Sequence, residues 1–138
     1  SEQGSGRWGD EKIVYTSAKV TKAKNSMLDL HVSATAAVDV DNPVFGFVIR
    51  SIDGRSVLGT NTHIKGESID TVKQGASCEL NWKMPSILSN GKYVVDIAIT
   101  QKDGATVHDW GESAATLEIT GKDKTPYIVS PDITVSRR

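Results

Sequence analysis

The sequence predicts an all-β protein, an antiparallel β-sandwich of the immunoglobulin-like or jelly-roll kind. Apolar and polar residues alternate along most of the chain, and no segment keeps helical spacing for three turns. Turn residues rich in Gly, Asp, Asn and Pro separate the alternating runs. The length of 138 residues suits one domain with one hydrophobic core. An apolar fraction of 38% and a mean hydropathy of -0.28 favour sheets with polar outer faces.

The clearest alternating run covers residues 30–40 and ends at the turn residues Asn42-Pro43. Side chains two residues apart share a face of a strand, so one set of positions is expected to be buried. That set is Leu30, Val32, Ala34, Ala36, Val38 and Val40. The same reasoning predicts neighbouring strands at about 13–20, 45–50 and 57–62, with Gly46 marking a bulge or a close backbone approach.

The second half of the chain repeats this style. Cys78, Leu80, Trp82 and Met84 share one face of a strand, so Trp82 is expected in the core. Asp53-Gly54 and Asp103-Gly104 are hairpin turn signals. The remaining predictions are a loop at 85–91, a strand at 93–99, a short strand at 107–110 and another at 115–119.

The two ends of the chain differ from the alternating body. Residues 1–6 are small and polar and are interpreted as a linker, so the sandwich domain is expected at 7–121. Residues 122–138 form a hinged tail, because Pro126 and Pro131 isolate a last apolar segment at 133–135. That segment either completes the chain's own sheet or pairs with the open edge of a second subunit.

Charge and cysteine content exclude several classes of function. The net charge of -1 and the pI near 6.3 give no general affinity for nucleic acid. Cys78 is the single cysteine, so an intrachain disulfide is excluded and a cytoplasmic location is compatible. No apolar run approaches the roughly 18–20 residues that span a membrane.

The sequence carries little sign of catalytic chemistry, and the chain is predicted not to be an enzyme. The three histidines occupy separate segments, so neither a metal site nor a cofactor is expected. There is no Gly-x-Ser-x-Gly motif, and neither Gly-Lys pair belongs to a phosphate-binding loop. Asp96, Asp109 and Glu112 could pair as carboxylates only if they faced each other across a cleft. A small metal- or carboxylate-dependent enzyme is an alternative hypothesis, after the two binding functions described below.

Binding chemistry is better represented than catalysis. Sugars are held by flat apolar faces and by planar polar side chains that hydrogen-bond hydroxyls. Residues of these types, expected on polar faces or at strand ends, are Arg50, Asn61, His63, Lys65, His31 and Trp110. Asn61 could equally cap a turn. Residue pattern alone leaves both carbohydrate-binding and protein-binding sandwiches open.

Several segments, in order, resemble one known family. They are Arg7-Trp8-Gly9, residues 42–54 with 57–62, Gly91-Lys92-Tyr93 and His108-Asp109-Trp110. Over about residues 7–120 the chain resembles the Wzt-type C-terminal domain, which is carried by the ATP-binding subunit of ABC transporters that export O-antigen polysaccharide. The chain lacks a Walker A motif, so ATP hydrolysis would lie in another domain.

The resemblance implies a concrete function and set of partners. Such domains bind the finished O-polysaccharide, often through its modified non-reducing end, and couple that recognition to export. The implied partners are the ATP-binding domain, the membrane subunit and a second copy that exchanges its last strand, all at the cytoplasmic side of the inner membrane. The family offers no short signature of binding residues. The six candidates therefore rest only on their residue types and on their expected positions on polar faces or at strand ends. The alternative is a structural or protein-binding sandwich that assembles through an edge strand.

Overall fold

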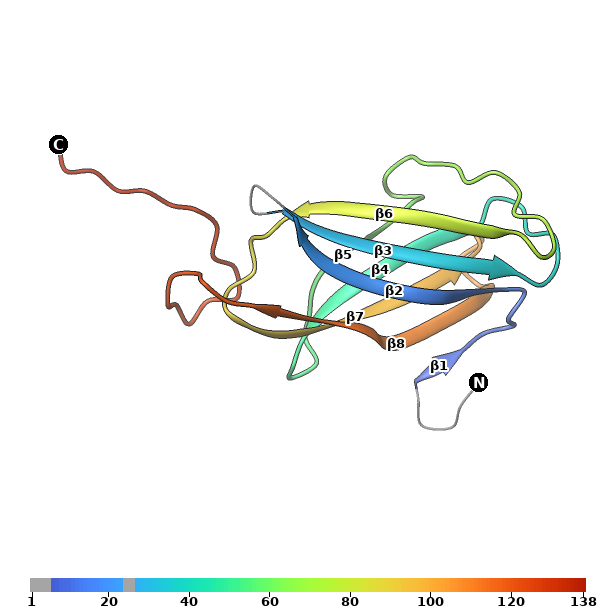
Figure 1. Ribbon diagram of the computed structural model, residues 1–138, viewed down its shortest axis with the longest axis horizontal. Helices are drawn as coiled ribbons and strands as arrows, with labels where there is room; N and C mark the ends of the chain where they lie inside the picture. The colour runs from blue at the N-terminus through green and yellow to red at the C-terminus, as the bar shows by residue number, and fades with distance from the viewer. Residues whose placement is uncertain (1–5, 24–26) are drawn as a thin grey trace.

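The computed structural model describes residues 6–23 and 27–138 and consists of two antiparallel sheets packed face to face (Figure 1). The predicted β-sandwich is therefore confirmed. The strands are β1 (Arg7–Trp8), β2 (Ile13–Ala23), β3 (Met27–Ala36), β4 (Val44–Ser51), β5 (Ser56–Asn61), β6 (Ser77–Pro85), β7 (Gly91–Thr100) and β8 (Val107–Ile119). The large sheet has the order β1-β8-β7-β4-β5, and the small sheet has the order β2-β3-β6.

The core lies between the two sheets and follows the predicted alternation. Along β3 every second side chain is buried, from Leu28 to Ala36. These side chains share the core with inward-facing residues of β4 and β7: Phe45, Phe47, Ile49, Tyr93, Val95, Ile97 and Ile99. Trp82 of β6, which was expected in the core, is half-buried and packs against it. Its ring lies edge-on to Phe47 with 5.2 Å between centroids.

The expected burial of Val38 is wrong. β3 ends at Ala36, and Val38 is 43% exposed in the bend that follows. Val40 is buried, but through an isolated bridge to Val72 and not as part of β3. The chain leaves the sheet after Ala36, so the alternation of side chains about the pleat no longer decides which positions face the core.

Residues 107–119 form one strand where two were expected. β8 runs continuously beside β7, with a change of register between the pairs Val95–Ala115 and Ile97–Gly111. At this bulge Ser113 has φ +54, and its N–H donates to Asp96 Oδ1 at 2.9 Å. The carboxylate of Asp96 therefore replaces a ladder partner, and pairing resumes on both sides of the bulge.

The tail leaves the sandwich after a short contact with it. Ser89 N donates to Ile128 O at 2.9 Å, and Leu88 forms an isolated bridge with Val129. Residues 130–138 form no strand within this chain, so the expected strand at 133–135 is absent here. Figure 1 shows this end extending away from the sheets, with Ile133 80% and Val135 96% exposed. Among residues 6–23 and 27–138, no helix has the length and apolar character needed to cross a membrane.

Candidate functional site

Five residues lie in one row across the outer face of the large sheet. Cross-strand pairing places them in the order Asn61, Gly46, Ala98, Trp110 and Trp8, one from each strand. Adjacent strands lie about 4.8 Å apart, so the backbones of Asn61 and Trp110 are separated by about 14 Å. Gly46 and Ala98 lie between Asn61 and Trp110 and carry almost no side chain. The row is therefore low in the middle and high at both sides, which makes a groove that we call the outer groove.

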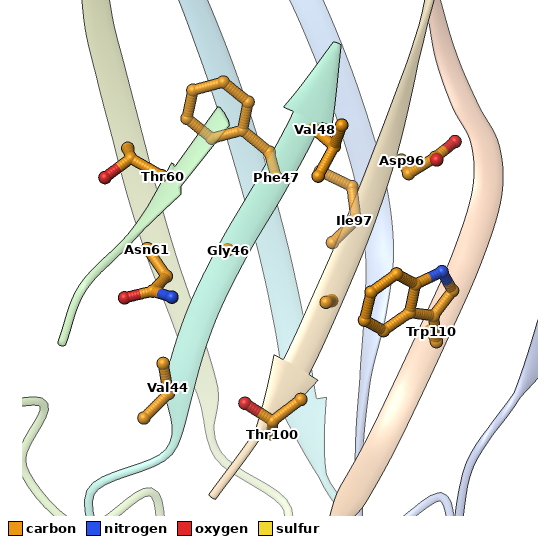
Figure 2. A pocket seen from close by; sticks show the side chains of 11 residues that line it. Val44, Gly46, Phe47, Val48, Thr60, Asn61, Asp96, Ile97, Thr100 and Trp110 are labelled. Atoms are coloured by element: carbon orange, nitrogen blue, oxygen red, sulfur yellow. The ribbon is translucent and has the colours of Figure 1, made fainter. Parts of the chain in front are cut away.

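The outer groove has a mostly apolar floor and polar groups near its ends. Figure 2 shows Asn61 on one side and Trp110 on the other, with Val44 and Thr100 toward one end and Val48 and Asp96 toward the other. Its volume is about 150 Å³. Pockets for drug-sized ligands measure roughly 300–1,000 Å³, so this groove suits a single ring or a small substituent.

Close backbone packing explains why glycine forms the floor. A Cβ built on Gly46 would lie 3.0 Å from Asn61 Cβ and 3.2 Å from Thr60 O. One on Gly59, the neighbouring outward position of β5, would lie 2.7 Å from Phe47 O. The predicted close approach at Gly46 is confirmed, and the same packing keeps the groove open.

An ion pair stands at one end of the groove. Arg50 donates to Asp96 from Nε at 2.7 Å and from Nη2 at 3.0 Å, and this hydrogen bonding raises the pKa of Arg50. The carboxylate neutralises the guanidinium. The pair therefore adds hydrogen-bonding groups to this end of the groove without adding net charge.

An aromatic pair forms the opposite side. The rings of Trp110 and Trp8 are nearly parallel, with 6.1 Å between centroids and 16° between planes. Trp110 is half-buried, whereas Trp8 is 53% exposed. Flat indole faces offer the apolar surface on which the C–H side of a ring-shaped ligand can lie.

The structure brings together only part of the predicted site. Trp110 and Asn61 face each other across the outer groove, and Arg50 adjoins it through Asp96. His63 lies in the exposed turn after β5 and lines a neighbouring hollow, which shares Val44 with the groove. The other two candidates lie elsewhere.

Those two candidates are Lys65 and His31. Lys65 is exposed at the side of the sandwich, in a hollow beside Trp82. His31 belongs to β3 of the small sheet, where its Nε2 lies 2.9 Å from Glu79 Oε1. His31 is therefore on the opposite sheet from the outer groove.

Asn61 has a structural role in addition to its place at the groove. Its Oδ1 accepts a hydrogen bond from Ile64 N at 2.7 Å, so the alternative that Asn61 caps a turn is confirmed. Figure 2 shows its Nδ2 on the side of Gly46, above the floor. The turn thus orients the amide so that its N–H groups face the groove.

Sequence reasoning missed Gly46, Ala98 and Trp8 as parts of this site. Gly46 was noted only as a bulge or close backbone approach and Trp8 only as part of the family resemblance. The cross-strand pairing is what puts all three in one row. The sequence signal that could have indicated this site is a small residue in the middle of each of two strands, Gly46 and Ala98. The strands on either side of them carry the planar side chains Asn61 and Trp110.

Asp96 and Asp109 are not arranged as a pair for hydrolysis. Asp96 lies on the outer face of the large sheet, whereas Asp109 is buried on the inner face with Arg7. The two therefore do not face each other across a cleft. Within the described ranges, no three His, Cys, Asp or Glu side chains gather to hold a metal ion.

A β-sandwich with a shallow groove of planar polar and aromatic side chains on one outer face has the form of a binding module. The family model described as the Wzt C-terminal domain matches residues 5–129, so the chain belongs to that family. Membership implies a role in O-antigen ABC transporters.

A solved structure agrees at the level of fold. The crystal structure of the C-terminal domain of Wzt superposes with a TM-score of 0.85 at 19% sequence identity, over 99% of this chain and 90% of that one. No curated protein sequence matches the chain.

Proposed function

We propose that this domain binds O-antigen polysaccharide in the outer groove without catalysing a reaction, and that binding couples recognition of the polymer to its export by an ABC transporter. The observation that carries the proposal is the cross-strand row in which Asn61 and Trp110 stand on either side of Gly46 and Ala98. A pyranose ring resting on this floor would meet an indole on one side and an amide on the other.

The energetics of such a site suit a polymer. Each hydrogen bond to a sugar hydroxyl contributes about 0.5–1.5 kcal/mol net. Contact with one indole face adds an amount of about the same size. One sugar unit therefore binds weakly, and useful affinity needs several contacts at once or several domains acting together.

The size and charge of the groove favour an uncharged end group. A volume of about 150 Å³ accommodates a single terminal ring or a small substituent. Arg50 adjoins the groove through Asp96, and its charge is already paired with that carboxylate. Lys65 lies in hollows beside Trp82 and not in the groove, so it supplies no positive charge there.

A glycan array of bacterial O-polysaccharides tests the proposal. The domain should retain one structural type of O-polysaccharide and ignore unrelated glycans. In titration against that polymer, Trp110→Ala should lose about tenfold in affinity or more, which corresponds to about 1.4 kcal/mol. His31→Ala is the matched control, because His31 lies on the other sheet and should leave affinity unchanged. Absence of binding to every O-polysaccharide on the array would refute the proposal.

We further propose that the domain assembles as a homodimer and works at the cytoplasmic side of the inner membrane, beside an ATP-binding domain and a membrane subunit. Residues 131–138 carry the exposed apolar side chains Ile133 and Val135. β5 and β6 are edge strands of their sheets, and side chains of both line one hollow. A tail strand from a second copy could pair with one of these edges.

Removal of residues 131–138 separates this assembly from an alternative function. A truncated domain that becomes monomeric by light scattering and still binds glycan supports strand exchange as the means of dimerisation. The alternative is a protein-binding module that uses the same edges. It would be favoured if the full-length domain bound no glycan and the truncation abolished binding to a protein partner instead.

A further inference from the structure

Strand β1 is only two residues long, yet it is held firmly against β8. It pairs with β8 through Arg7–Gly111 and Trp8–Trp110. The two side chains of β1 point to opposite faces of the sheet, so Arg7 faces the interior when Trp8 faces out. One residue therefore anchors the strand, and the other extends the row of the outer groove.

The anchor is an ion pair between the partly exposed Arg7 and the buried Asp109. Arg7 donates to Asp109 from Nε at 3.0 Å and from Nη2 at 2.7 Å, and this hydrogen bonding raises the pKa of Arg7. Arg7 Nη2 also donates to Tyr15 O at 2.7 Å, and its guanidinium carbon lies 3.9 Å from the centroid of the Tyr15 ring. Asp109 accepts a further bond from Tyr15 N at 2.9 Å. These contacts join β1, β2 and β8 at one point.

The backbone on either side of β1 is held equally closely. Glu112 N donates to Gly6 O at 3.0 Å, and Glu11 N donates to His108 O at 2.8 Å. Gly9 has φ +146, and a Cβ on it would lie 2.3 Å from His108 O, so no larger residue fits there. The position of Trp8 is thus specified from both sides.

This anchoring holds the indole of Trp8 in an exposed position. Trp8 keeps 53% of its surface exposed while its ring lies beside that of Trp110. If the only role of Trp8 were to cover Trp110, an indole held this firmly would be expected to bury more of its own surface. Rigid, partly exposed Trp side chains next to a groove are typical of recognition sites.

We propose that Trp8 is a specificity-determining residue of the outer groove, and that the site takes at least two consecutive sugar units. This inference rests on the proposed function. The end unit lies between Asn61 and Trp110, and the next unit crosses β8 and contacts Trp8. Arg7 and Asp109 are positioning residues that act through Trp8 and do not touch the ligand.

The test uses the O-polysaccharide that the wild-type domain binds best on the array, together with its monosaccharide and oligosaccharide fragments from the non-reducing end. Wild type should bind the oligosaccharide at least about tenfold more tightly than the monosaccharide. Trp8→Ala should remove most of that difference, so that the variant binds the oligosaccharide little better than the monosaccharide. The matched control is Tyr127→Ala, because Tyr127 is an aromatic residue 73% exposed in the tail.

A double-mutant cycle tests the positioning role. Arg7→Gln should weaken oligosaccharide binding several-fold in the wild-type background and should add no loss in a Trp8→Ala background. Equal losses in both backgrounds would show that Arg7 acts only through stability. If Arg7→Gln does not fold, Arg7→Lys serves instead, because it keeps the charge and loses the bidentate geometry.

The outcomes separate the two proposals. A wild-type domain that binds no O-polysaccharide overturns the proposed function and this inference together. Only the role of Trp8 is overturned if the domain binds O-polysaccharide, Trp110→Ala weakens that binding, and Trp8→Ala affects the binding of every fragment no more than Tyr127→Ala does.

Discussion

Asp96 on β7 receives both N–H bonds of Arg50 from β4, at 2.7 and 3.0 Å, and it also accepts the N–H of Ser113 at the bulge in β8. One carboxylate thus joins three neighbouring strands on the outer face of the large sheet. It also borders the outer groove. This end of the groove is therefore held by a hydrogen-bonded cluster.

Asp96→Asn should destabilise the domain by about 1–3 kcal/mol, because the amide cannot accept all three bonds and leaves Arg50 without its counter-charge. Urea unfolding measures the change. Glu79→Gln is the control, since Glu79 belongs to an exposed pair with His31 whose contribution should be small. Equal stability changes for the two variants would contradict this role for Asp96.

Ala98→Leu should block glycan binding without unfolding the domain. Ala98 faces outward on β7 and forms part of the groove floor, so a longer side chain can extend into open space above the sheet. We expect a loss of about tenfold or more in affinity for the O-polysaccharide selected on the array, measured by calorimetric titration. Thr116→Leu, an exposed β8 position outside the groove, is the control. Full binding by Ala98→Leu would place the ligand elsewhere.

Asp103 should make stability depend on pH in the acid range. Thr106 N–H and Ala105 N–H donate to its carboxylate, as does the Thr106 hydroxyl, and these bonds lower its pKa from the ordinary 3.8. Because the pKa of Asp103 is lower in the folded state, its carboxylate stabilises the fold fully at pH values above its pKa in the unfolded chain. This stabilisation is lost as the pH falls through its pKa in the folded state.

Urea unfolding at pH 6 and at pH 3 checks this dependence. The stability advantage of wild type over Asp103→Asn should shrink at the lower pH. An advantage of the same size at both values would rule out the carboxylate as the source of the effect.

Gly111→Ala should disturb the junction beneath Trp8. A Cβ on Gly111 would lie 2.0 Å from the Tyr15 hydroxyl and 2.6 Å from two of its ring carbons. Displacing Tyr15 should cost about 1–3 kcal/mol of unfolding free energy, the usual range for overpacking. In a Tyr15→Ala background the same substitution should cost far less, and thermal unfolding of all four proteins completes the cycle. A cost that does not depend on Tyr15 would contradict the clash.

Local features of the sequence determined the fold class and much of the core. The alternation along 28–36, the hairpin turns at Asp53-Gly54 and Asp103-Gly104, and the inward position of Trp82 all follow from neighbouring residues. The pleat repeats every two residues, and a turn depends on its own few dihedral angles, so both are readable from a short stretch of chain.

The site was decided by tertiary structure. Asn61, Gly46, Ala98, Trp110 and Trp8 form a row only because five strands pair in one register and one order. The same pairing put His31 on the other sheet and merged 107–119 into one bulged strand. Pairing joins residues as far apart as Trp8 and Trp110 through backbone bonds that carry no local signal, so the alternating pattern shows which face a residue takes but not which residues share it.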